Sequence, residues 1–160
     1  MKQTPSDGLL SIHHVQLSRY INDAAIPNAK KFLDHHGEHM AILVFCNDSG
    51  HLTMMSLEGG IPSADKWPTC RMVLKEAKAV WYFVVSEAWL AIYDRHSSCD
   101  VKPSQREDKA ECLVIVGNTV VGEPVVRVFT LRREEGKVSL GDEQDCGSEF
   151  GGEMIKLLED

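Results

Sequence analysis

The order of hydrophobic and polar positions divides the chain into helical and strand-like segments. Apolar residues recur every three or four positions in 9–25 and again after Asp65, a spacing typical of amphipathic helices. Other runs are apolar at consecutive positions or rich in β-branched and aromatic residues, which indicates strands. The predicted strands cover residues 40–46, 51–57, 80–93, 110–119 and 125–132, with 137–140 as a candidate short edge strand.

This pattern predicts a single α+β domain with the element order α-β-β-α-β-β-β. Helices packed on one face of a mainly antiparallel sheet are the economical arrangement for that order. The clearest hairpin joins 40–46 to 51–57 through the turn cluster Asn47-Asp48-Ser49-Gly50. We expect the domain to span residues 1–141. Residues 142–160 form an acidic C-terminal segment, in which Phe150, Met154, Leu157 and Leu158 are the apolar face of a candidate short helix.

The excess negative charge lies at one end of the chain. Lys and Arg number 17 and Asp and Glu number 24, which gives a net charge of −7. Residues 134–160 contain nine acids and two bases, and 2 − 9 = −7, so residues 1–133 are neutral overall. This balance argues against a general polyanion-binding protein, and we expect no nucleic-acid partner. The tail is either a solvated extension or a contact for a basic partner.

Cysteine usage and hydropathy point to a protein of a reducing compartment. The five cysteines are odd in number, and no pair has C-x-x-C spacing, so we expect neither a disulfide scaffold nor a cysteine zinc site. The first twenty residues contain no uninterrupted apolar run, and the most apolar stretch, 80–93, is interrupted by Ser86 and Glu87. We therefore expect a cytoplasmic protein with no membrane segment.

Glu87 is the main catalytic candidate. On a strand it shares a face with aromatic side chains such as Trp81 and Phe83, and a carboxylate there is costly unless it is paired or protonated. It could act as a general acid or base together with His96. The alternatives are a bulge that turns Glu87 outward or a structural ion pair with Arg127.

Two further groups are candidates for binding and for metal ligation. Aromatic and cationic residues at and after the end of the strand 80–93 could contact a partner; these are Trp89, Tyr93, Arg95 and Arg106. The run H-H-G-E-H offers His35, His36 and His39 as metal ligands. However, Gly37 breaks the helical spacing, and histidines also suit a helix C-terminus. We therefore expect no metal and no cofactor.

One stretch of the chain resembles a group of known sequences. The run Val85-Ser86-Glu87-Ala88-Trp89 is followed by Pro103-Ser104, by Arg106-Glu107 and by a strand that begins Glu111-Cys112-Leu113-Val114. Over residues 80–121 this is similar to small uncharacterised proteins of bacteria and their phages. The resemblance implies a microbial, cytoplasmic context and no particular activity.

Three functions remain open at this stage. The first is a non-catalytic binding or accessory protein that acts through protein–protein contacts, with a second copy of the chain among the candidate partners. The second is a small hydrolase-like enzyme that uses Glu87 with His96 or a histidine-bound metal. The third is an acidic inhibitor of a basic partner surface. The absence of the G-x-x-x-x-G-K-[ST], G-x-G-x-x-G and G-x-S-x-G motifs favours the first.

Overall fold

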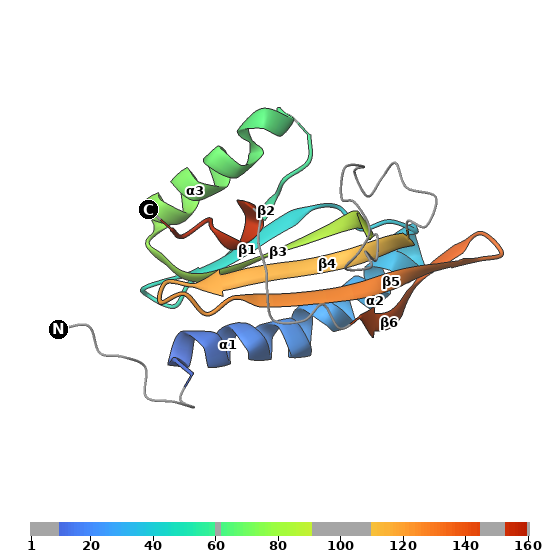
Figure 1. Ribbon diagram of the computed structural model, residues 1–160, viewed down its shortest axis with the longest axis horizontal. Helices are drawn as coiled ribbons and strands as arrows, with labels where there is room; N and C mark the ends of the chain where they lie inside the picture. Colours follow the sequence, from blue (N-terminus) through green and yellow to red (C-terminus); the bar gives the residue numbers. More distant parts are fainter. Residues whose placement is uncertain (1–9, 60–61, 91–109, 145–152, 160) are drawn as a thin grey trace, which may run out of the picture.

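The computed structural model describes residues 10–59, 62–90, 110–144 and 153–159 of the chain (Figure 1). In this part of the protein, six strands form one sheet in the order β2-β1-β3-β4-β5-β6, and all neighbours pair antiparallel. The predicted α+β class and antiparallel sheet are confirmed. The strands are β1 (Ile42–Asn47), β2 (Leu52–Ser56), β3 (Ala79–Leu90), β4 (Ala110–Thr119), β5 (Val125–Glu134) and β6 (Lys137–Gln144).

The N-terminal helices form one continuous rod. Helix α1 (Ile12–Tyr20) passes through a π-helical turn, η1 (Ile21–Ala25), into α2 (Ile26–His36). The Ser11 hydroxyl accepts a hydrogen bond from the His14 N–H at 3.2 Å and so caps α1. Pro27 lies in the first turn of α2, and Gly37 ends that helix with a φ of 74°.

The helices lie on both faces of the sheet, and the expectation that they share one face is wrong (Figure 1). The rod α1-η1-α2 covers one face, and α3 (Lys66–Ala77) covers the other. The physical reason is that β3 is apolar at consecutive positions, so both of its faces need cover. Trp81, Phe83 and Val85 of β3 pack under the rod with Leu17 and Ile21, whereas Tyr82 and Val84 pack under α3 with Cys70 and Leu74.

The end of the chain differs from the expected order. The candidate short edge strand is a full strand, β6, so four consecutive strands follow α3 instead of three. It pairs with β5 through a turn in which Glu135 and Gly136 both have positive φ, at 50° and 79°. Two such residues are typical of a tight two-residue hairpin. The strand continues to Gln144, beyond residue 141 where we expected the domain to end.

The candidate C-terminal helix is reduced to one 3-10 turn, η4 (Glu153–Ile155), in the described residues. Side chains of the sheet hold this segment. The Tyr82 hydroxyl donates to the Met154 carbonyl and accepts from the Leu157 N–H at 3.3 Å, and burial raises the pKa of Tyr82. The Asn118 side-chain amide donates to the Ile155 carbonyl at 2.9 Å. Residues 154–158 therefore pack against the sheet as part of the fold.

None of the helices in the described ranges is both long enough and apolar enough to cross a bilayer.

Candidate binding groove

An apolar groove lies between the N-terminal rod and the strands β1 and β2. It encloses about 420 Å³ on the sheet face that the rod covers. The rod packs most extensively on β3, β4 and β6, and the edge strand β2 lies beyond these main contacts. The floor is made of buried Val44, Phe83 and Val85, and Phe32 of α2 forms one wall. We call this hollow the β2 groove.

Two methionines form the open side of the β2 groove. The side chain of Met54 on β2 is 71% exposed, and that of Met40 is 42% exposed. A second hollow of about 390 Å³ lies beside α1, where Leu52 of β2, itself 49% exposed, is part of the lining together with Cys46 and Trp81. Exposed apolar residues thus follow β2 along the length of this face.

Histidines line the end of the β2 groove near the C-terminus of α2. The rings of His36 and His39 pack on Phe32, with ring centroids 4.5 and 5.2 Å from that of Phe32. His35 also lines the groove, and His39 Nδ1 lies 2.7 Å from the Met40 carbonyl oxygen. Across the described ranges, no three or more His, Cys, Asp or Glu side chains come together in a way that could hold a metal ion. The three candidate ligands therefore contribute an aromatic and polar wall instead.

Glu87 is held by a main-chain donor. Its Oε1 accepts a hydrogen bond from the His39 N–H at 2.9 Å, which ties β3 to the segment that leaves α2. The expected bulge is absent at this position, because the β3–β4 register runs without a break from Trp81 to Leu90. The structural partner of Glu87 is thus a main-chain group, which a search for oppositely charged side chains would miss.

The expected ion pair between Glu87 and Arg127 is wrong. Arg127 Nη2 donates to Glu143 Oε2 at 3.0 Å, and its Nη1 donates to Asn22 Oδ1 at 2.7 Å. The hydrogen bond with Glu143 raises the pKa of Arg127, and the same bond lowers the pKa of Glu143. Arg127, on β5, therefore joins η1 to β6 instead of pairing with Glu87.

Most of the other candidate residues lie outside the described part of the chain. These are His96, Tyr93, Arg95 and Arg106. Trp89 belongs to β3, where its backbone is in register with Glu111 of β4. The catalytic pair of Glu87 with His96 and the binding set around Trp89 stay predictions.

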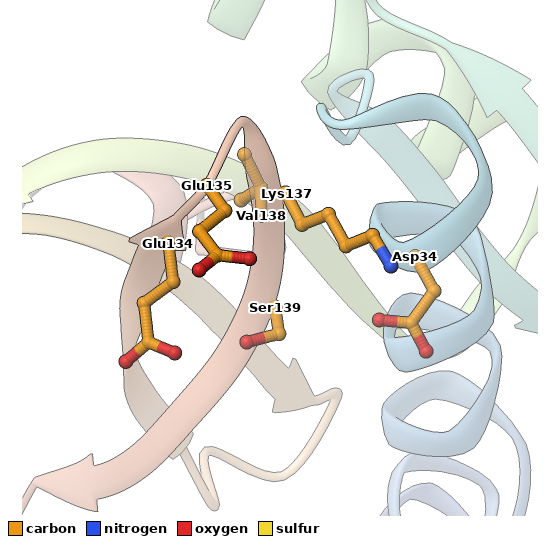
Figure 2. Close-up of a pocket in the computed structure, with 6 residues that line it drawn as sticks. All are labelled: Asp34, Glu134, Glu135, Lys137, Val138 and Ser139. Atoms are coloured by element: carbon orange, nitrogen blue, oxygen red, sulfur yellow. The ribbon is translucent and has the colours of Figure 1, made fainter.

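A further hollow, of about 800 Å³, has a different chemical character (Figure 2). It lies between α2 and the β5–β6 hairpin, and Figure 2 shows Lys137 extending toward the helix that carries Asp34. The remaining lining is mainly acidic or hydroxylated, with Val138 as its one apolar member; it comprises Glu134, Glu135, Val138 and Ser139. It lacks the apolar floor that binding pockets generally have, so the β2 groove is the better candidate.

Within the part of the chain that the structure describes, no strand pairs with the outer edge of β2. Asn47 N donates to His51 O at 3.0 Å, and Leu57 N donates to Ala41 O at 2.9 Å. Hydrogen-bonded positions alternate along an antiparallel strand, so Thr53 and Met55 also face β1. The N–H and C=O groups of Leu52, Met54 and Ser56 consequently point away from the sheet.

The two edges of the sheet are protected to different degrees. Strand β6 carries Lys137, Asp142 and Glu143, its pairing with β5 has a register shift, and α2 contacts it. Strand β2 has no charged residue, no proline and no bulge in its pairing with β1. Sequence reasoning identified β2 as a strand but missed this edge as a site. The signal available in the sequence was that none of the five residues of this strand is charged.

In comparisons with known proteins, no family model, no curated protein and no solved structure matches the chain.

Proposed function

We propose that this protein is a non-catalytic binding protein that acts through protein–protein contacts, by adding a strand of its partner to β2. The observation that carries this proposal is the uncharged outer edge of β2, with the main-chain groups of Leu52, Met54 and Ser56 directed away from the sheet. Natural sheets normally protect such edges, because an open edge is a template for another strand. An exposed strand edge that lies beside an apolar groove is therefore a favourable place for a partner strand to bind.

The side chains of β2 add specificity to this mode of binding. In strand addition, main-chain hydrogen bonds supply affinity and alternate side chains supply specificity. Leu52 and Met54 lie on the face of the sheet that contains the β2 groove. Apolar side chains of an added strand would lie beside them and extend the wall of that groove. The partner is therefore a protein segment that is extended and apolar at alternate positions.

The hydrolase alternative has weaker support from the described residues. The Oε1 atom of Glu87 accepts the His39 N–H, and the three histidines do not form a metal site. A carboxylate whose hydrogen bond fixes a main-chain segment has a structural role. This role does not depend on a substrate. The observations on Glu87 therefore favour the binding function.

Site-specific photo-crosslinking tests the proposed binding surface. A photo-reactive residue in place of Ser56, which is exposed on β2, should form covalent adducts with a protein partner. The matched control is the same residue in place of Met72, which is 56% exposed on α3 and should form none. Adducts from Met72 alone, or from neither position, would contradict the proposal.

Two variants at one position then separate main-chain pairing from side-chain contact. Met54→Pro removes an N–H that faces outward, which edge strands tolerate. We expect binding of the purified cross-linked partner to weaken by at least about tenfold, since a hydrogen bond and its neighbours are lost. Met54→Thr keeps the N–H and should weaken binding by only about threefold, because a few contacts are lost. Titration calorimetry measures both, and equal losses would contradict pairing through the main chain.

A further inference from the structure

We infer that the strand which pairs with β2 is β2 of a second copy of this chain, arranged antiparallel about a twofold axis at Met54. This inference rests on the proposed function and names its partner. Two features carry it: the sheet formed by the described residues has one open edge, and the sequence of that edge is compatible with itself.

The number of open edges favours a closed pair. In the described sheet β2 has β1 as its single neighbour, and the opposite edge, β6, is charged and contacted by α2. An isologous contact between two β2 strands uses the open edge of both copies at once. Because β6 is protected, the assembly stops at two copies. A contact between β2 and β6 would instead continue into a filament.

The hydrogen-bonding alternation fits an axis at Met54. This residue is the centre of β2, and its N–H and C=O face outward. Antiparallel pairing about it places Met54 opposite Met54 and Leu52 opposite Ser56. These are the positions with outward main-chain groups, so each such pair exchanges both of its hydrogen bonds. No outward-facing group within Leu52–Ser56 is left without a partner.

The charges and side chains of the edge are also self-compatible. No residue of β2 is charged, so the axis brings no like charges together within the strand. Just beyond the strand, Glu58 falls opposite Gly50, and the Glu58 carboxylate already accepts the Ala41 N–H of its own chain at 3.0 Å. The exposed Met54 side chains of the two copies come to lie beside each other, and each Leu52 lies beside Ser56 of the other copy. The open sides of the two β2 grooves therefore meet and cover each other.

Light scattering during size-exclusion chromatography, combined with a charge exchange at Met54, tests this arrangement. The wild-type chain should elute as a dimer. Met54→Lys and Met54→Glu should each weaken the dimer by at least about tenfold, because like charges face each other across the axis. An equimolar mixture of the two variants should form a heterodimer, since lysine then faces glutamate.

The controls keep the outcome clear. Circular dichroism should show that both variants fold, because Met54 is exposed. Met72→Lys on α3 is the matched control and should remain a dimer. A monomeric wild type, a dimer that survives Met54→Lys, or a mixture that stays monomeric would each overturn the inference. If a monomeric wild type still forms adducts with a different protein from position 56, the proposed function stands and this inference fails. If position 56 forms no adduct at all, both fail.

Discussion

Replacing Gly117 with alanine is expected to destabilise the protein by about 3 kcal/mol or more, because β3 and β4 approach too closely for a side chain at this position. A Cβ atom at Gly117 would lie 2.4 Å from the Tyr82 carbonyl oxygen and 3.0 Å from the Phe83 Cβ. Both neighbours belong to the central strand β3, and Gly117 is in register with Phe83. Relief would require the two strands to separate, which weakens their hydrogen bonds.

Gly122→Ala is the matched control for this substitution. Gly122 has a φ of 81°, and nothing lies within 4 Å of the added Cβ. Its cost should be limited to backbone strain of about 1–2 kcal/mol. Urea unfolding of both variants, followed by fluorescence, gives the two free energies of unfolding. A Gly117→Ala variant as stable as Gly122→Ala would contradict the close approach of β3 and β4.

Replacing Glu123 with glutamine is expected to lower the free energy of unfolding by about 1–2 kcal/mol at neutral pH, since charge-assisted hydrogen bonds are lost. The Glu123 carboxylate joins the start of α1 to the turn between β4 and β5. It accepts the Ser11 N–H at 2.8 Å, the Ser11 hydroxyl, and the Thr119 hydroxyl at 3.0 Å. Without the charge, the N-terminus of α1 is held less firmly against the sheet.

The same residue should make stability depend on acid pH. Burial acts to raise the pKa of Glu123, but the hydrogen bonds from Ser11 and Thr119 outweigh it, and the pKa is lower than its usual value of 4.5. The unfolded chain therefore binds the proton more readily than the folded protein. The stabilisation is present above about pH 4.5 and is lost as the pH falls through the lowered folded-state pKa.

Urea unfolding over a series of acidic pH values measures this contribution. Glu123→Gln should flatten the loss of stability below about pH 4.5, because its side chain does not titrate. Glu134→Gln makes the same change at an exposed position and should stay within about 0.5 kcal/mol of wild type. An unchanged acid profile in Glu123→Gln would contradict the role of this carboxylate.

The local elements of the fold could be predicted because their signals are local. Ser11 caps the start of the N-terminal rod and Gly37 ends it, and both residue types favour those positions. The consecutive apolar positions of β3 correctly predicted a buried strand. The same pattern also indicates that both faces of β3 are buried by other elements. The prediction that all helices lie on one face did not take this into account. Only the first half of β6 was predicted, because the charged residues of its second half interrupt the alternation of apolar and polar positions.

The candidate site depended on contacts that no local pattern records. Glu87 is paired with the N–H of His39, and any residue other than proline supplies that group. Arg127 reaches Asn22 and Glu143, which lie 105 and 16 positions away in the chain. The β2 groove exists because the rod packs most extensively on β3, β4 and β6, away from the edge strand β2. Where the rod crosses the sheet is a property of the whole fold.

Amide hydrogen exchange along β2, resolved by residue with NMR, tests strand addition most directly. Thr53 and Met55 face β1 and serve as internal references, whereas Leu52, Met54 and Ser56 face outward. In the bound state, whether the added strand comes from a second copy or from another protein, all five amides should be protected from exchange. If the amides of Leu52, Met54 and Ser56 exchange freely while those of Thr53 and Met55 stay protected, no strand occupies this edge and the account is contradicted.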